Sequence, residues 1–192
     1  DENGGLQNRT VLPTPISMAA TINPARVNHA ARIAAKEIRN AGNQWTFAPT
    51  LDIVQDARFG RTGETYGECP FLTTVMARSA IRGYQNHENP QHRVAACVKH
   101  YVGGGASVGG VNHGNAEISE RMLRSVFLPP FRAAADAGVM TLMPGHNNVN
   151  GIPMHASNWL LTDMLKDEFG FNAFLTTDLG DRDTLRGDIL TG

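Results

Sequence analysis

The sequence has little cysteine, no long apolar run and almost no net charge, and each shortage excludes a class of protein. Two cysteines, Cys69 and Cys97, are too few for a disulfide framework and lack the spacing of a metal site. The 17 basic and 18 acidic residues form no long runs, so we expect no binding to nucleic acid or a membrane surface. No apolar stretch approaches the roughly 18 residues of a membrane span. A small neutral or polar ligand is the partner that this composition favours.

What is present is typical of a globular chain. A length of 192 residues with 41% hydrophobic residues supplies a sizeable core and corresponds to one domain or part of one. The chain begins at Asp1, without an initiating methionine or a signal-peptide pattern, so we expect Asp1 to be a cut or processed end.

Strand and helix patterns alternate along the chain. Asn23 as N-cap, Pro24 at the first helical position and Gly42 as a stop predict an amphipathic helix. Further helices are predicted from Pro70, over 118–138 with an interruption at Pro129 and Pro130, and over 158–169 with Ser157 as the cap. Strands are predicted over 44–52, 93–100, 139–145 and 172–178.

This alternation predicts an α/β fold with a parallel sheet that is buried on both faces. The long, glycine-rich connections follow the strands, and the connections after the helices are short, as in a (β/α) barrel with its site at the strand ends. A full barrel needs about 250 residues and eight units. Four strands are clear, and residues 1–5 could be the stub of a fifth. We therefore expect an incomplete TIM-type barrel with four or five of the eight units.

Polar side chains follow all four predicted strands: Asp52, the pair Lys99 and His100, His146, and Asp178. Taken alone, an Asp that leaves a strand is more often a turn former than a catalyst, because its carboxylate bonds nearby backbone amides. Four such positions at the same rim of a barrel are harder to explain as turns. The pattern therefore predicts a site at this rim.

Several motifs resemble, in order and spacing, the N-terminal barrel domain of family 3 glycoside hydrolases, and they cover nearly the whole chain. The motifs are FAPTLDIVQDARFGRTGETYGEC, VAACVKHYVGGG, ISERMLRSVFLPPFRAAADAGV, NGIPMHASNWLLTDMLKDEFGF and TTDLGD. The resemblance implies a retaining, exo-acting β-glycosidase of the β-glucosidase type. It also implies a carbohydrate substrate, no metal or organic cofactor, and a periplasmic or secreted location.

The resemblance assigns roles to individual residues. The family nucleophile matches Asp178, which would attack the anomeric carbon while a second carboxyl group protonates the leaving oxygen. The residues expected to bind substrate are Lys99, His100, Arg61, His146, Met143 and Asp1. The acid/base Glu of the β-glucosidase branch comes from a later domain and matches no residue here, so we expect the isolated chain to be nearly inactive.

The sequence departs from the family pattern at three places. Leu179 stands where the family usually has Trp, Ala57-Arg58-Phe59 replaces Pro-Arg-Trp, and His146 replaces a common Tyr. Asp181 is expected to belong to the following turn or to face solvent.

Other interpretations remain open at this stage. In a second branch of the family, the β-N-acetylhexosaminidases, a loop His is the acid/base, and His113 lies near that place, although a solvent-facing loop residue is the commoner explanation. Lys99 at a strand end could form a Schiff base. The chain could also be a non-catalytic sugar-binding or packing segment. Open sheet edges would favour self-association or pairing with a missing segment of the same barrel.

Overall fold

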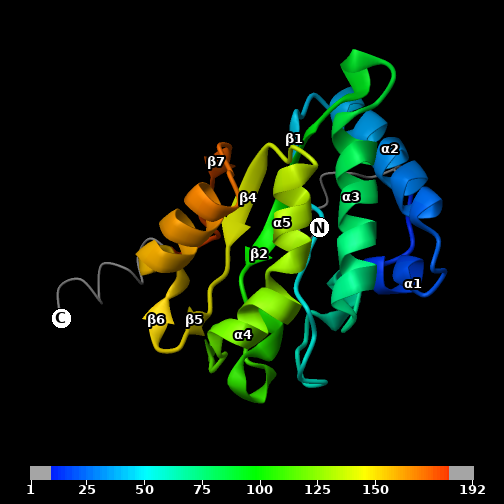
Figure 1. The fold of residues 1–192 in the computed structure, drawn as a ribbon. Helices are drawn as coiled ribbons and strands as arrows, with labels where there is room; N and C mark the ends of the chain where they lie inside the picture. The colour runs from blue at the N-terminus through cyan, green and yellow to red at the C-terminus, as the bar shows by residue number, and fades with distance from the viewer. Residues whose placement is uncertain (1–9, 182–192) are drawn as a thin grey trace.

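A computed structural model describes residues 10–181. The predicted N-terminal stub and Asp1 lie outside the described residues. Four parallel strands form the central sheet in the order β1-β2-β4-β7 (Figure 1): β1 (Trp45–Thr46), β2 (Ala95–Tyr101), β4 (Thr141–Pro144) and β7 (Phe174–Leu175). This confirms the four predicted strands and the α/β class.

The helices agree with the sequence patterns. They comprise α1 (Pro15–Ala19), α2 (Pro24–Asn40), α3 (Pro70–Gln85), α4 (Glu120–Met122) and α5 (Pro129–Asp136). The Asn23 side chain accepts hydrogen bonds from the Ala25 and Arg26 amides, as an N-cap should. Before Pro129 the chain widens into a π-helix over Leu123–Phe127, which is the interruption that the prolines predicted. None of the helices in the described part of the chain is long and apolar enough to cross a membrane.

The last predicted helix also adopts π geometry, over Trp159–Glu168, and Ser157 Oγ accepts a hydrogen bond from the Leu160 amide at 3.3 Å. A second, smaller sheet was not predicted. It has the order β3-β5-β6 and consists of β3 (Asn115–Ala116), β5 (Asn148–Val149) and β6 (Ile152–Pro153). Because each of these strands has two residues, no alternation of polar and apolar residues could have revealed them.

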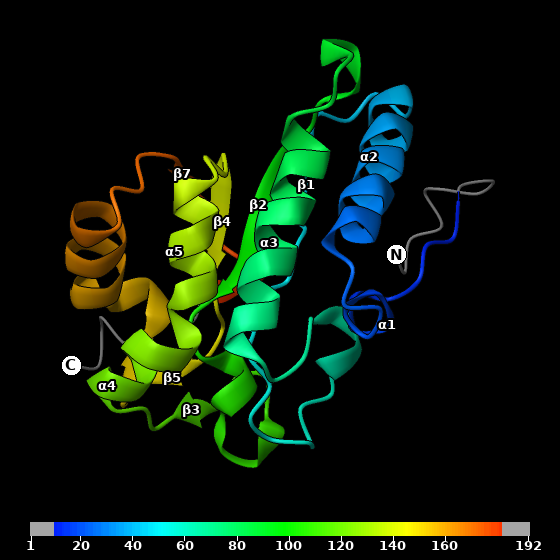
Figure 2. The same cartoon turned by 45° about the vertical axis from the view of Figure 1, so that its right-hand side comes forward.

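The helices α3 and α5 cover one face of the central sheet, and α2 packs outside α3 (Figures 1 and 2). Both faces are buried in the central strands β2 and β4, as expected, but not in the edge strands β1 and β7. On the edge strands Trp45 is 38% exposed and Phe174 is 61% exposed, and their rings lie edge to face at 6.2 Å. The face away from the helices is therefore partly open, and self-association through it stays a prediction.

The glycine-rich loop after β2 packs against the loop after β1. The Gln55 amide donates to the Gly105 carbonyl at 2.9 Å, and a Cβ added at Gly105 would collide with the Ile53 carbonyl oxygen. The two loops can approach this closely only because residue 105 lacks a side chain. Glycine here brings two strand-end loops together.

We expect Gly105→Ala to lower the free energy of unfolding by about 1–3 kcal/mol, because the methyl group overpacks a backbone contact. Chemical denaturation measures the change. Gly60→Ala is the matched control, since a Cβ at Gly60 meets nothing within 4 Å. Equal stabilities of the two variants would contradict this account of the loop contact.

Candidate active site

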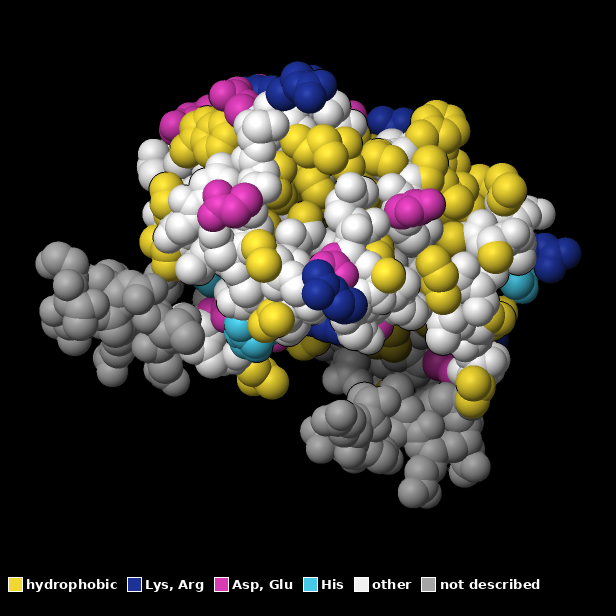
Figure 3. All heavy atoms as spheres, turned by 90° about the horizontal axis from the view of Figure 1, so that it is seen from below, with side chains coloured by type: hydrophobic (Ala, Val, Ile, Leu, Met, Phe, Trp, Pro, Cys, Tyr) yellow, Lys and Arg dark blue, Asp and Glu magenta, His cyan; other side chains and the backbone are white. Residues whose placement is uncertain are grey.

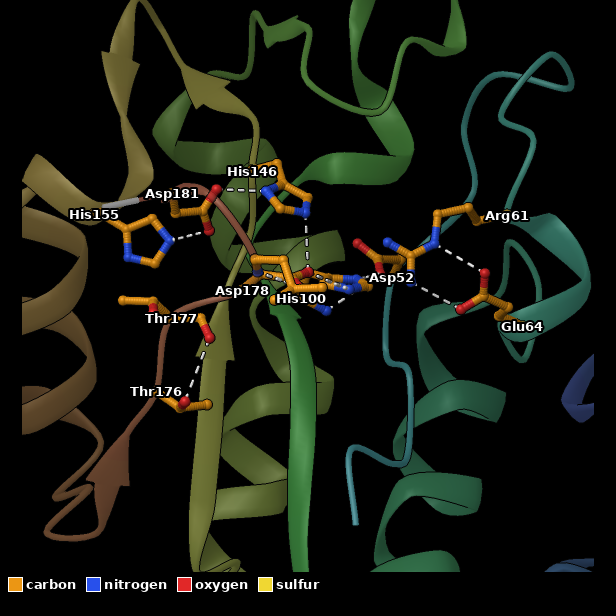
Figure 4. A network of polar contacts seen from close by, with 11 residues as sticks. Asp52, Arg61, Glu64, His100, His146, His155, Thr176, Thr177, Asp178 and Asp181 are labelled. Atoms are coloured by element: carbon orange, nitrogen blue, oxygen red, sulfur yellow. Dashed lines mark hydrogen bonds and ion pairs between the residues drawn. The ribbon is translucent and has the colours of Figure 1, made fainter. Parts of the chain in front are cut away.

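The four parallel strands end at the same edge of the sheet, and the polar residues that follow them lie together there (Figure 4). Figure 3 looks onto this end of the molecule, where basic and acidic side chains lie side by side among apolar ones. The structure brings Asp52, His100, His146 and Asp178 into one connected set of contacts. Their gathering follows from parallel topology, which directs every strand's carboxyl end to one edge.

Asp178 lies at the centre of this set. Its Oδ1 accepts a hydrogen bond from the Leu179 amide at 2.7 Å, and its Oδ2 lies 3.0 Å from His146 Nε2. Burial by itself raises the pKa of the Asp178 carboxyl. The Leu179 hydrogen bond and nearby positive charge outweigh burial and hold that pKa below its usual value; the charge comes from His146, His100 and Lys99. Asp178 is therefore ionised at neutral pH.

The first support of Asp178 is a buried pair formed by Asp52 and His100. Asp52 Oδ2 lies 2.8 Å from His100 Nδ1 and also accepts from the His100 backbone amide at 3.2 Å. The other ring nitrogen, His100 Nε2, is buried, makes no hydrogen bond among the described residues and faces Asp178 Oδ2 at 3.7 Å. Asp52 thus fixes the ring so that Nε2 points into the site.

The second support corrects an expectation about Asp181. Instead of facing solvent, Asp181 is 4% exposed, and one of its oxygens contacts His146 Nδ1. Its other oxygen lies 2.6 Å from His155 Nε2, on the short helical turn Met154–Ala156. The turn assignment failed because both partners come from other elements of the chain.

Of the predicted substrate-binding residues, Lys99 and Met143 line a hollow of about 460 Å³, whereas Arg61, His100 and His146 are not part of its lining. Its lining consists of Phe47, Lys99, Met143, Thr177, Asp178, Leu179 and Gly180. Leu179, which stands in place of the usual Trp, is 91% exposed, so this wall of the hollow is open to solvent. A larger hollow near α1 is lined mainly by apolar side chains and lies away from these groups.

Arg61 lies on the loop after β1, where it forms a bidentate ion pair with Glu64. Both bonds measure 2.9 Å and use Arg61 Nε and Nη2. The hydrogen bond to Glu64 is the main reason why the pKa of Arg61 is raised, and the same bond lowers the pKa of Glu64. Glu64 holds the guanidinium in a fixed orientation beside the site.

The structure places other candidates less centrally. His113 is exposed, as the loop explanation predicted, yet its ring lies 4.3 Å from the ring of His146. The sequence analysis did not identify His155 as part of the site. The sequence shows it only as a polar residue in a turn, which does not distinguish it from a surface histidine. Within residues 10–181 no group of three His, Cys, Asp or Glu side chains is arranged to hold a metal ion.

Comparison with known proteins gives consistent matches along almost the whole chain. A β-xylosidase from Formosa agariphila is 42% identical over 179 residues, which cover 91% of this chain and 25% of that protein. A periplasmic β-glucosidase from Salmonella typhimurium is 34% identical over 174 residues, 90% of this chain and 23% of that protein. The chain thus spans about a quarter of the length of these relatives.

Solved structures match the fold as well as the sequence. A mutant β-glucosidase from Listeria innocua in complex with laminaribiose superposes with a TM-score of 0.89 at 34% identity, over 93% of this chain and 25% of that one. A β-glucosidase from Erythrobacter marinus has a TM-score of 0.91 at 37% identity, with 94% and 24% covered. Because the model of the glycosyl hydrolase family 3 N-terminal domain matches residues 1–184, the chain belongs to that family.

Proposed function

We propose that this chain carries the nucleophile and much of the sugar-binding subsite of a retaining, exo-acting β-glycosidase. The observation that carries the proposal is an ionised Asp178 that faces a hollow and contacts two histidines. Asp178 attacks the anomeric carbon, the bond to the leaving oxygen breaks, and that oxygen receives a proton from an acid. Water then attacks the same carbon and releases the sugar from the Asp178 ester.

The same arrangement suits recognition of hydroxyl groups. Lys99 lines the hollow beside Asp178. The buried His100 Nε2 has no hydrogen-bond partner among the described residues, and a sugar hydroxyl would satisfy it. Arg61 adds a planar cation whose orientation Glu64 fixes. Met143 supplies apolar surface against a sugar face, and the assignment of Asp1 to the same subsite extends this proposal beyond the described residues.

The substrate that this proposal favours is a terminal β-linked sugar of the glucosyl or xylosyl type. It rests on the similarity to proteins named as β-xylosidases and β-glucosidases, including one solved with laminaribiose. The hollow is open to solvent at the exposed Leu179, so its shape does not distinguish between these two sugars. Glucosyl and xylosyl groups differ in the hydroxymethyl group at C5, so contacts to that group decide between the two sugars. We assign none of the described residues to that contact.

The experiment that tests this function is covalent labelling with an activated 2-fluoro-β-glucoside, because its good leaving group needs no acid. We expect one sugar per chain, and peptide mapping should place it on Asp178. Attachment to another residue, or no attachment, would refute the proposal. Faster reaction of an activated acetamido sugar, lost in His113→Ala, would favour the β-N-acetylhexosaminidase alternative, and reductive trapping of a carbonyl compound on Lys99 would favour the Schiff-base one.

A further inference from the structure

His146 lies between two carboxylates and contacts one with each ring nitrogen. Nε2 lies 3.0 Å from Asp178 Oδ2, and Nδ1 contacts Asp181 Oδ1. Asp181 continues the chain of contacts through Oδ2, which lies 2.6 Å from His155 Nε2. Asp178, His146, Asp181 and His155 therefore form one array of contacts that begins at the hollow (Figure 4).

The contacts in this array differ in kind. His146 Nδ1 is hydrogen-bonded to Asp181 Oδ1, and His155 Nε2 is hydrogen-bonded to Asp181 Oδ2 at 2.6 Å. His146 Nε2 and Asp178 Oδ2 form an ion-pair contact at 3.0 Å that is not a hydrogen bond. Asp181, itself held by His155, therefore fixes the His146 ring with Nε2 facing the Asp178 carboxylate.

Both ring nitrogens of His146 face carboxylates. Asp178 and Asp181 lie in the segment after β7, and they are the only carboxylates in direct contact with the ring among the described residues. The His113 ring, from the loop after β2, lies against the face of the His146 ring. His155 meets the array through Asp181, while Lys99 and His100 act on Asp178.

The Asp52 and His100 pair provides the contrast. His100 Nδ1 contacts Asp52 at 2.8 Å, but its Nε2 lies 3.7 Å from Asp178, beyond a hydrogen bond. Of the two histidines beside Asp178, His146 is therefore the closer one, at 3.0 Å.

From this array we infer that His146, held by Asp181 and His155, is the positioning residue that orients the Asp178 carboxylate for attack. The inference rests on the proposed function of Asp178. It assigns to Asp181 and His155 a role that neither has as a turn residue: they keep the His146 ring aimed at Asp178.

The test separates rate from binding on the same protein. We expect Asp181→Asn, which keeps the shape and removes the charge, to slow labelling of Asp178 by the activated 2-fluoro-β-glucoside about 10- to 100-fold at pH 7. The maximal labelling rate should fall, while the inhibitor concentration that gives half of that rate stays the same, because the change misaligns Asp178 without touching the sugar. A role confined to stability would lower the unfolding temperature and leave the maximal labelling rate of the folded protein unchanged.

Controls separate the possible failures. Asp167→Asn makes the same change on an exposed residue of the Trp159–Glu168 helix and should label at the original rate. His155→Gln keeps a donor toward Asp181 and should lose less activity than Asp181→Asn. Labelling of Asp178 at the original maximal rate in Asp181→Asn would overturn this inference alone. Labelling at a residue other than Asp178 would overturn the proposed function, and this inference with it.

Discussion

Replacing Asp178 with Asn is expected to lower kcat/KM for an aryl β-glucoside by about 10³-fold or more, because the amide keeps the shape and removes the attacking charge. Its hydrogen bond from the Leu179 amide and its contact with His146 can both persist. The loss therefore reports on chemistry and not on folding, which circular dichroism and thermal unfolding of the variant would check.

Two comparison variants sharpen this result. Asp181→Asn should lose much less activity, since Asp181 acts through His146 and does not touch the sugar. Asp167→Asn, on an exposed helix position, should leave kcat/KM unchanged. If Asp178→Asn and Asp181→Asn were equally inactive, the two carboxylates would have to act as a pair, and the assignment of a single nucleophile would fail. Restoration of activity by added azide in Asp178→Ala, whose small side chain leaves room for the anion, would further support a missing carboxylate at this place.

The rim of the site could be predicted from the sequence because parallel topology leaves little choice. Once Lys99, His100 and Asp178 are placed at the ends of strands, a shared sheet edge brings them together. Helix boundaries were equally readable, since Asn23 and Pro24 signal a helix start locally. Local signals suffice wherever the partner of a residue lies a few positions away in the chain.

The supports of the site could not be predicted, because they depend on contacts between distant segments. Asp181 bonds to His146, 35 residues earlier, and Asp52 bonds to His100, 48 residues later. In sequence, an Asp after a strand looks the same whether it caps a turn or fixes a histidine. The sequence therefore assigns Asp181 to a turn or to solvent, and it gives no sign that His155 contacts Asp181. The two-residue strands of the small sheet were missed for the same reason, since they are defined only by their pairing.

A large difference in rate is also expected between substrates with good and poor leaving groups. It depends on whether the chain holds a general acid that protonates the leaving oxygen. Cleavage of an alkyl glycoside or a disaccharide needs a proton on the leaving oxygen, whereas a dinitrophenolate leaves without one. In residues 10–181 the carboxyl groups nearest to Asp178 are already engaged. Asp52 bonds to His100, Asp181 bonds to two histidines, and Glu64 pairs with Arg61. None of these three presents a proton to the hollow.

We therefore expect the purified 192-residue chain to turn over a dinitrophenyl β-glucoside slowly after an initial burst, and to leave a β-linked disaccharide essentially uncut. Burst and steady-state rates for the two substrates measure the difference, which should be about 10²–10⁴-fold because that is what a missing general acid typically costs. His113→Ala should change neither rate if the exposed His113 ring only stacks on His146. Steady hydrolysis of the disaccharide would show that the chain holds its own acid. A loss of that activity in His113→Ala would then identify the acid, because His113 is the one exposed imidazole in contact with the described array.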